Sequence, residues 1–335
     1  MPHLFLSGLM ASALAAVSLL MPSVASAPVI GGCQMFPNNN VWNTRIDTLP
    51  VHPRSDEWVN SVGFATRLHP DFGTFYLGDP IGIPYTTVVS STPSISVTFD
   101  YWDESDPGPY PIPQNPPIEG GPTSSGDRHV LIVNSAECKL YEMWSAYPQQ
   151  DGSWQAGSGA VFDLSSNALR PDGWTSADAA GLPVLPALVR YDEAASGAIN
   201  HALRFTAAST QRAYLWPARH FASSITDPGV PPMGARFRLK QSVDISGFPA
   251  MVRPIFQAMK TYGMFLADNG SNWFVSGEHD PRWDDDELVT AFRALHGYDF
   301  EVVDELGMMV SPDSGAAATA RAFLPMTMRD FGIGW

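Results

Sequence analysis

The sequence predicts a mainly β protein, a single-domain β-sandwich or jelly roll with a few peripheral helices. The chain has 30 prolines and 28 glycines, and its apolar runs are short and end at these residues. These runs are not regularly followed by helical stretches of comparable length, which disfavours a parallel α/β fold. The clearest helical stripe of apolar residues is confined to residues 250–262.

The two ends of the chain differ in composition from its middle. Residues 4–21 form an uncharged apolar run, and the small residues 23–27 follow it. This order is typical of a signal peptide, which we expect to span residues 1–25. We expect one β-rich domain over residues 26–310 and a C-terminal tail over residues 311–335. The sequence therefore predicts a secreted, extracellular protein with no membrane association after signal cleavage.

Two cysteines, Cys33 and Cys138, are present. In an oxidising compartment such a pair predicts one disulfide, which would close a loop of about 100 residues. The alternative is a lipid anchor on Cys33, because the preceding residues 29–32 loosely resemble a lipobox. A disulfide would also make the Pro-rich, acidic segment 100–126 a surface loop rather than a linker between domains.

The formal net charge of −15 argues against a nucleic-acid partner. The eight histidines lack the spacing of zinc ligands, so we expect no metal or other cofactor. Carboxylates of the 100–106 segment could ligate calcium, but they match no EF-hand, and a solvated acidic loop is the favoured interpretation. We expect a monomer.

Residues 127–144 predict a hairpin around which the fold is organised. If residues 134–137 form its loop, Val133 lies opposite Cys138 and His129 lies opposite Glu142. The hairpin is apolar on both faces, which is typical of the middle of a sheet. A His–Glu pair there is costly unless the two side chains satisfy each other. Both a structural pair and a functional site remain open.

Elsewhere, two peripheral helices are expected at residues 250–262 and 284–296, with short helices at 55–62 and 191–196. A further short helical turn is expected to begin at Thr175 or Ser176 and to end at Gly181. We expect Ser55 to cap the helix at 55–62, and Pro254 to lie in the first turn of the helix at 250–262. Asn269-Gly270 predicts a hairpin turn between strands at 264–268 and 271–276.

No standard catalytic motif occurs in the sequence. Polar residues on or beside predicted strands form the candidate catalytic set: His129, Glu142, Asp163, Asp178, His201, His220 and Asp268. Residues that could bind or stack on a substrate form the second set: Arg219, Trp144, Trp174, Trp216 and Trp273.

Longer phrases carry a resemblance. VWNTRIDTLPVHP, GSGAVFDLSSNALRPDGWTSADAAGLP, YLWPARH and LADNGSNWF resemble an uncharacterised family of secreted bacterial proteins. The resemblance extends from about residue 33 to 304 and implies export and a single unit across the Pro-rich segment. It implies no activity and no catalytic residues.

The expected function is action on, or binding of, an extracellular polysaccharide or cell-wall glycan. Export, acidity, ten tryptophans and scattered acids favour a hydrolase or lyase that uses acid–base catalysis. A lyase would need a uronate clamp, for which Arg128, Arg190, Arg204 and Arg219 are available. A non-catalytic glycan-binding or cell-surface protein is the alternative, and an exported peptidase is a third possibility.

Overall fold

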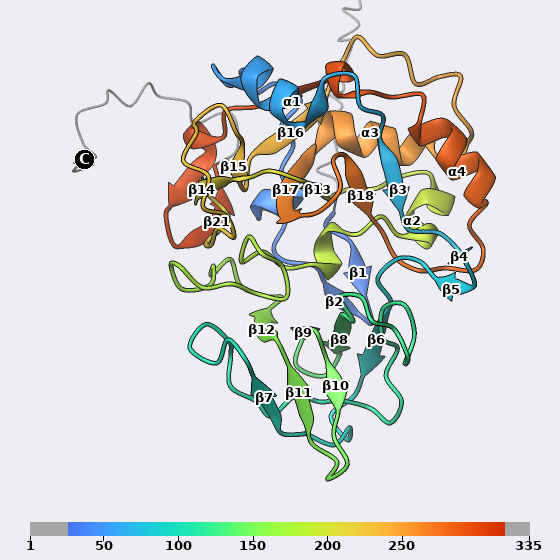
Figure 1. Cartoon of the computed structure of the whole chain (residues 1–335), viewed down its shortest axis with the longest axis vertical. Coiled ribbons are helices and arrows are strands. Elements are labelled where there is room, and N and C mark those ends of the chain that lie inside the picture. The colour runs from blue at the N-terminus through green and yellow to red at the C-terminus, as the bar shows by residue number, and fades with distance from the viewer. Residues whose placement is uncertain (1–25, 319–335) are drawn as a thin grey trace, which may run out of the picture.

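The computed structural model describes residues 26–318. The expected signal peptide and residues 319–335 of the expected tail lie outside this range. Within it the protein is mainly β, as predicted, and has four α-helices (Figure 1). The helices are α1 (Ser55–Gly63), α2 (Tyr191–Ser196), α3 (Arg253–Thr261) and α4 (Asp285–Phe292).

Two sheets dominate the structure. The larger has six strands in the order β19-β16-β17-β13-β18-β3 and lies in the upper part of Figure 1, near α1, α3 and α4. In that order its strands are Phe300–Val302, Arg236–Leu239, Met264–Asn269, Leu203–Ala207, Phe274–Ser276 and His69–Asp71. The smaller sheet, in the lower part, has the order β12-β9-β8-β6, with strands Ser158–Asp163, Lys139–Trp144, Val130–Asn134 and Tyr85–Val88.

Shorter strands complete the fold. A three-stranded sheet joins β10 (Tyr147–Pro148), β11 (Trp154–Ala156) and β7 (Val97–Phe99). Four strand pairs have the bounds β1 (Val29–Ile30) with β2 (Cys33–Gln34), β4 (Phe75–Tyr76) with β5 (Asp79–Pro80), β14 (Gln211–Tyr214) with β15 (Pro232–Met233), and β20 (Met309–Ser311) with β21 (Ser314–Ala317).

The hairpin of β8 and β9 lies inside its sheet, as the two apolar faces predicted. Leu131 and Val133 face the large core shared with the six-stranded sheet. Val130 and Ile132 face a smaller core that includes Trp154 of β11. Both faces are therefore removed from water, which explains why the strand lacks polar alternation.

The register of this hairpin differs from the expected one. Leu131, not His129, lies opposite Glu142, because the first paired residues are Asn134 and Lys139. The predicted direct pair of His129 with Glu142 is therefore wrong, although both side chains lie on the same face of the sheet.

The helices follow the sequence closely, with one corrected cap. Pro254 lies in the first turn of α3, where its missing N–H costs no hydrogen bond. Asp284 caps α4 by accepting from the Glu287 N–H. Ser55 is the first residue of α1 rather than its cap, and its hydroxyl accepts from the Val302 N–H instead.

The hairpin expected at Asn269-Gly270 does not form. Strand β13 lies between β17 and β18, pairing parallel with β17 and antiparallel with β18. The turn signal is local, whereas β13 supplies a buried apolar strand that satisfies the backbone of both neighbours.

The Cys33–Cys138 disulfide is present and the Cα atoms are 5.3 Å apart. It connects the N-terminal pair β1–β2 with the loop of the central hairpin. The folded domain also continues beyond residue 310, since β21 pairs with β20 and Ala316 bridges to Asn40. Residues 311–318 of the expected tail are therefore part of the fold.

Replacing both cysteines by serine should lower the free energy of unfolding by about 4 kcal/mol, because the bond closes a loop of 105 residues. Urea unfolding of the oxidised wild type and of C33S/C138S measures the difference. A loss below about 1 kcal/mol would show that the crosslink contributes little.

Candidate functional site

A pocket of about 370 Å³ is lined by segments from both large sheets and from the loops between them. Its lining includes Trp144 of β9, Ser158 of β12 and Asp268 of β17. The remaining lining residues are Tyr101, Glu104, Asp127, Thr175, Ser176, Ala177, Asp178, Ala179, His220, Ala222 and Asn269. We call this the acidic pocket, because four carboxylates line it.

A β-bulge places Asp268 in this pocket. The pairing of β13 with β17 shifts between Phe205 and Thr206, which leaves Ala267 without a cross-strand partner. The Ala267 carbonyl instead accepts from the Ala180 N–H at 3.0 Å. Bulges often redirect a side chain in this way. Here the bulge brings Asp268 and the loop that carries Asp178 to the same place.

Glycine shapes the turn of that loop. Gly181 has φ +69°, and a Cβ at this position would lie 2.5 Å from the Trp174 carbonyl oxygen. The Gly181 N–H donates to the Asp178 carbonyl, and the Ser176 hydroxyl contacts the carbonyls of Asp178 and Leu182. The loop is thus fixed by its own backbone, which holds Asp178 at the pocket.

Arg204 of β13 lies beneath the carboxylates. Its Nε donates to Asp178 Oδ2 at 3.1 Å, and its Nη2 lies 3.8 Å from Asp268 Oδ2. Its Nη1 donates to the Ser276 hydroxyl at 2.7 Å. Both Arg204 and Asp178 are buried, so each depends on the other for charge compensation.

The two aspartates are shifted toward the protonated form. Desolvation, followed by the charge of Asp178, raises the pKa of Asp268 to about 7, although Arg204 opposes this. Burial also raises the pKa of Asp178, against the effect of Arg204. One arginine therefore faces two carboxylates, and near neutral pH a proton is readily held on Asp268.

One carboxylate oxygen in this arrangement has no protein partner. Asp178 Oδ1 is buried and accepts no hydrogen bond from the residues that the structure describes. Buried acceptors of this kind are rare in folded proteins, and a catalytic role or a bound water or ion is among the explanations for them. Asp178 lines the acidic pocket with its side chain fully buried, so a ligand donor would have to enter the pocket wall to satisfy this oxygen.

His220 and Glu104 form another side of the pocket. His220 Nδ1 lies 2.8 Å from the Ala179 carbonyl, an acceptor, so this nitrogen carries a hydrogen. In the neutral ring the lone pair is therefore on Nε2, which lies 3.7 Å from Glu104 Oε2. Glu104 also accepts from the Thr175 N–H at 3.1 Å.

Aromatic rings form a wall beside these groups. The ring centroids of Tyr101 and Trp144 are 6.4 Å apart with an interplanar angle of 41°. Trp144 Nε1 donates to Asp127 Oδ1 at 3.3 Å. Rings and carboxylates side by side are suited to sugars, whose faces stack on rings while their hydroxyl groups donate to acids.

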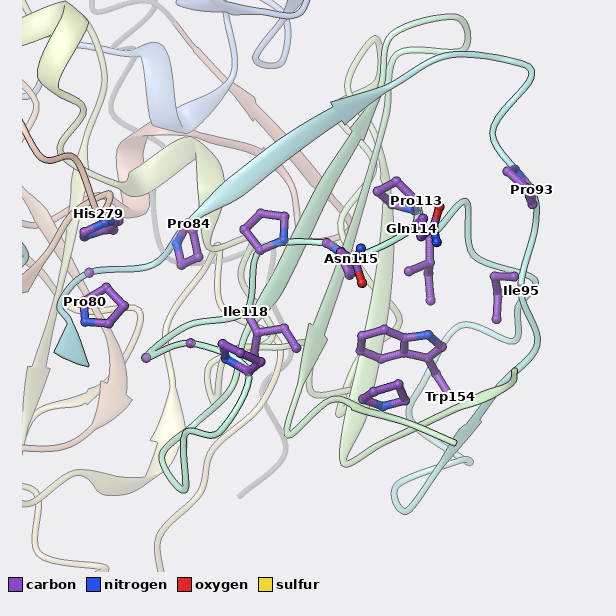
Figure 2. A pocket seen from close by; sticks show the side chains of 18 residues that line it. Pro80, Pro84, Pro93, Ile95, Pro113, Gln114, Asn115, Ile118, Trp154 and His279 are labelled. Atoms are coloured by element: carbon purple, nitrogen blue, oxygen red, sulfur yellow. The ribbon is translucent and has the colours of Figure 1, made fainter. Parts of the chain in front are cut away.

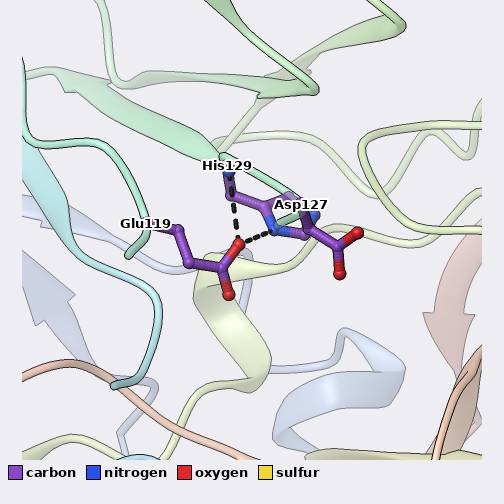
Figure 3. A group of neighbouring side chains, drawn as sticks. All are labelled: Glu119, Asp127 and His129. Atoms are coloured by element: carbon purple, nitrogen blue, oxygen red, sulfur yellow. Dashed lines mark hydrogen bonds and ion pairs between the residues drawn. The ribbon is translucent and has the colours of Figure 1, made fainter. Parts of the chain in front are cut away.

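His129 lies behind the pocket and pairs with Glu119 rather than Glu142. Figure 3 shows Glu119 joined to the His129 ring, with Asp127 on the other side and its carboxylate turned away from Glu119. His129 Nδ1 lies 2.6 Å from Glu119 Oε2, and Nε2 lies 2.9 Å from the Ala177 carbonyl. Burial opposes the charged ring, but the charge and hydrogen bond of Glu119 raise the pKa of His129 to about 9.

Potential ligand atoms of Glu119, Asp127 and His129 lie within 4.8 Å of one another, which is close enough to hold a metal ion. A metal-bound histidine needs a free lone pair on one ring nitrogen. Both nitrogens of His129 face acceptors, and its raised pKa favours the doubly protonated ring. The arrangement therefore fits an ion pair better than a metal site.

Glu142 has a structural role. It is buried, and its carboxylate accepts from the N–H groups of Val184 and Leu185. Burial raises its pKa to about 7, although these backbone bonds oppose the shift. Glu142 thus holds the far end of the loop that carries Asp178, rather than orienting His129.

The structure brings four predicted site residues into the acidic pocket: Trp144, Asp178, His220 and Asp268. The others lie elsewhere. Asp163 is exposed and hydrogen-bonds Ser165, whereas His201 is buried against Glu193. Trp273 belongs to the core.

The remaining predicted binding residues have structural partners. Trp216 Nε1 donates to the Ser314 carbonyl, and Arg219 binds the Pro312 carbonyl and Asp313. Trp174 lies beside the Arg170 guanidinium. None of these three residues lines the acidic pocket.

Sequence reasoning did not assign Arg204, Glu104, Asp127 or Glu119 to their positions here. A charged residue within the apolar strand 203–207 was a usable signal for Arg204, because a buried charge needs a partner. Glu104 and Asp127 border a Pro-rich loop and were indistinguishable from solvated acids. Glu119 carries no local signal, since its partner is set by the course of that loop.

A larger pocket of about 830 Å³ lies under the Pro-rich loop (Figure 2). Pro80 and His279 lie at one end, and Ile95 and Trp154 at the other. Its lining is mostly proline rings and aliphatic side chains, with His279 as its one titratable side chain among the described residues. This surface could bind apolar groups but offers no paired acid and base.

No family model, curated protein or solved structure matches the chain. The resemblance to secreted bacterial proteins therefore stays a prediction. Within residues 26–318, no helix is long and apolar enough to cross a membrane.

The His129–Glu119 pair should make stability depend on pH. Because its folded pKa of about 9 exceeds the ordinary 6.5, His129 stabilises fully below about pH 6.5 and loses this contribution as the pH rises through about 9. We expect H129Q to lower the free energy of unfolding at pH 6.5 by about 3 kcal/mol, because Glu119 loses its buried partner.

Urea unfolding between pH 6 and pH 10 measures this effect. The partly buried His279 provides the control, since H279Q should keep the wild-type pH dependence. If the free energy of unfolding changes with pH above pH 8 by the same slope in wild type and in H129Q, the ion-pair interpretation is wrong.

Proposed function

We propose that this protein is a secreted hydrolase that cleaves glycosidic bonds in an extracellular polysaccharide or cell-wall glycan. The observation that carries the proposal is Asp268, a partly exposed carboxyl with a pKa of about 7 in a pocket that three other carboxylates also line. Glycoside hydrolysis needs one carboxyl that holds a proton at working pH and one that is ionised. The proposal is therefore based on the site, not on similarity to a known enzyme.

Each group has a defined part in this mechanism. Asp268 gives its proton to the glycosidic oxygen, and the bond from the anomeric carbon to that oxygen breaks with its electron pair remaining on the oxygen. Glu104 takes a proton from the water that attacks the anomeric carbon. Asp178, held by Arg204, keeps the pKa of Asp268 raised. Tyr101 and Trp144 stack on the sugar.

Charge favours a hydrolase over a uronate lyase. Among the described residues, the lining of the acidic pocket contains four acids and no lysine or arginine. The four arginines considered for a uronate clamp make other contacts, for example Arg128 with three backbone carbonyls. An anionic substrate would therefore be repelled.

Export is part of the proposal. The disulfide is typical of oxidising compartments and so supports an extracellular location. We propose that the protein acts as a monomer on its glycan. A screen of plant and microbial polysaccharides, scored by new reducing ends and by absorbance of unsaturated uronates, separates hydrolase from lyase.

Replacing Asp268 by Asn should lower kcat on the substrate found by at least about 100-fold, because the general acid is lost. The exposed Asp163 supplies a matched control, and D163N should keep full activity. Initial rates and thermal unfolding are measured for both variants. A folded D268N with wild-type kcat would exclude this residue as the acid.

The alkaline side of the pH profile of activity should be set by Asp268. Asp268 acts in its protonated form, so kcat/KM should fall as the pH rises through about 7. Rates between pH 4 and pH 9 test this expectation. A rate that still increases from pH 7 to pH 9 would contradict it.

The screen also tests the alternative function. Saturable binding of a glycan without any new reducing end, in wild type and D268N alike, would make the protein a glycan-binding module.

A further inference from the structure

We infer that the acidic pocket recognises a glycan with free amino groups, a polymer or oligomer of hexosamine units bound as ammonium ions. This inference rests on the proposed function and specifies its substrate class. It is argued from the charge of the lining, an unpaired buried acceptor, and the position of Asp127 beside an aromatic ring.

The balance of charge is the first argument. Of the four acids that line the acidic pocket, Asp268 readily holds a proton near neutral pH and Asp178 is paired with Arg204, so Glu104 and Asp127 carry the uncompensated charge. A second guanidinium behind the lining, that of Arg170, is compensated by Asp106. The positive ring of His129 is compensated by Glu119. The pocket therefore retains an excess of negative charge. The formal net charge of −15 extends this field outward, which favours the approach of a cation.

The second argument is Asp178 Oδ1, which is buried and lacks a donor among the described residues. A carboxylate oxygen is only an acceptor, so an O–H or N–H group of a ligand that reaches it from the pocket would satisfy it. Hexosamine supplies both kinds of donor, and its ammonium has three N–H bonds.

Asp127 and Trp144 supply the third argument. Asp127 is exposed, and its Oδ1 accepts from Trp144 Nε1 at 3.3 Å, so the carboxylate is fixed at the edge of the ring. An ammonium group next to a stacked sugar ring can contact the carboxylate while its charge interacts with the aromatic face. An acetamido group is neutral and gains neither interaction.

The test compares binding of a β-1,4-linked glucosamine tetramer with its fully N-acetylated counterpart. Both are titrated calorimetrically into full-length D268N at pH 6 and 4 °C, where hydrolysis is suppressed. We expect the free-amine tetramer to bind at least about tenfold more tightly. Raising the salt concentration from about 25 mM to 500 mM should reduce this difference in affinity, because salt screens the attraction between the ammonium groups and the carboxylates.

Asp127 and Asp163 provide matched variants, since both are exposed aspartates. In the D268N background, D127N should reduce the affinity ratio of the free-amine to the acetylated tetramer to about threefold or less, without weakening binding of the acetylated tetramer. D163N in the same background should leave this ratio unchanged. Equal affinity for the two tetramers, no binding of either, or equal effects of D127N and D163N would overturn the inference.

These outcomes separate the inference from the proposed function. If the wild type hydrolyses neutral glycans and binds the two tetramers with equal affinity, the inference of amine recognition is wrong and the proposed hydrolase function stands. Amine-selective binding with no hydrolysis of any glycan would support the inference and remove the hydrolase.

Discussion

The buried guanidinium of Arg204 is the constraint on which the centre of the molecule depends. A charge taken out of water must be compensated, and Arg204 has Asp178, Ser276 and Asp268 around it. These residues come from an irregular loop and from the two strands that flank β13. Satisfying one cation thus fixes the loop against the sheet, and the same contacts create the acidic pocket.

Three buried polar contacts support this arrangement from the other side of the pocket. Glu142 accepts from the backbone at Val184 and Leu185, and His129 donates to the Ala177 carbonyl. Both residues belong to the hairpin segment at the centre of the smaller sheet. The loop between residues 174 and 185 is therefore held at Ala177 and at Val184 and Leu185 by side chains of one sheet, and at Asp178 by Arg204 of the other. A rigid support of this kind is what a site with perturbed carboxylates needs.

The sequence predicted the fold where the determinant was local and failed where it was a choice of partner. Apolar periodicity located α3 and the acidic first turn located α4, whereas the helical turn expected near residues 175–181 is not a helix. The disulfide followed from the cysteine count and compartment. The turn signal at Asn269-Gly270 failed because β13 occupies the place of the second hairpin strand. His129 was correctly seen as a residue needing a partner, but Glu119 arrives through a Pro-rich loop whose path no local pattern determines.

The same distinction applies to the site. Asp178, His220 and Asp268 were chosen because they flank predicted strands and turns, and they meet in one pocket. Asp163 and His201 also flank predicted strands but lie elsewhere. A position beside a strand does not determine at which sheet edge, or on which face of the sheet, the side chain lies. What separates the two groups is the bulge at Ala267, whose free carbonyl receives the Ala180 N–H and draws two distant acids together. The raised pKa of Asp268 has burial as its first cause and the charge of Asp178 as its second, and the bulge supplies the second by bringing the two carboxyl groups together.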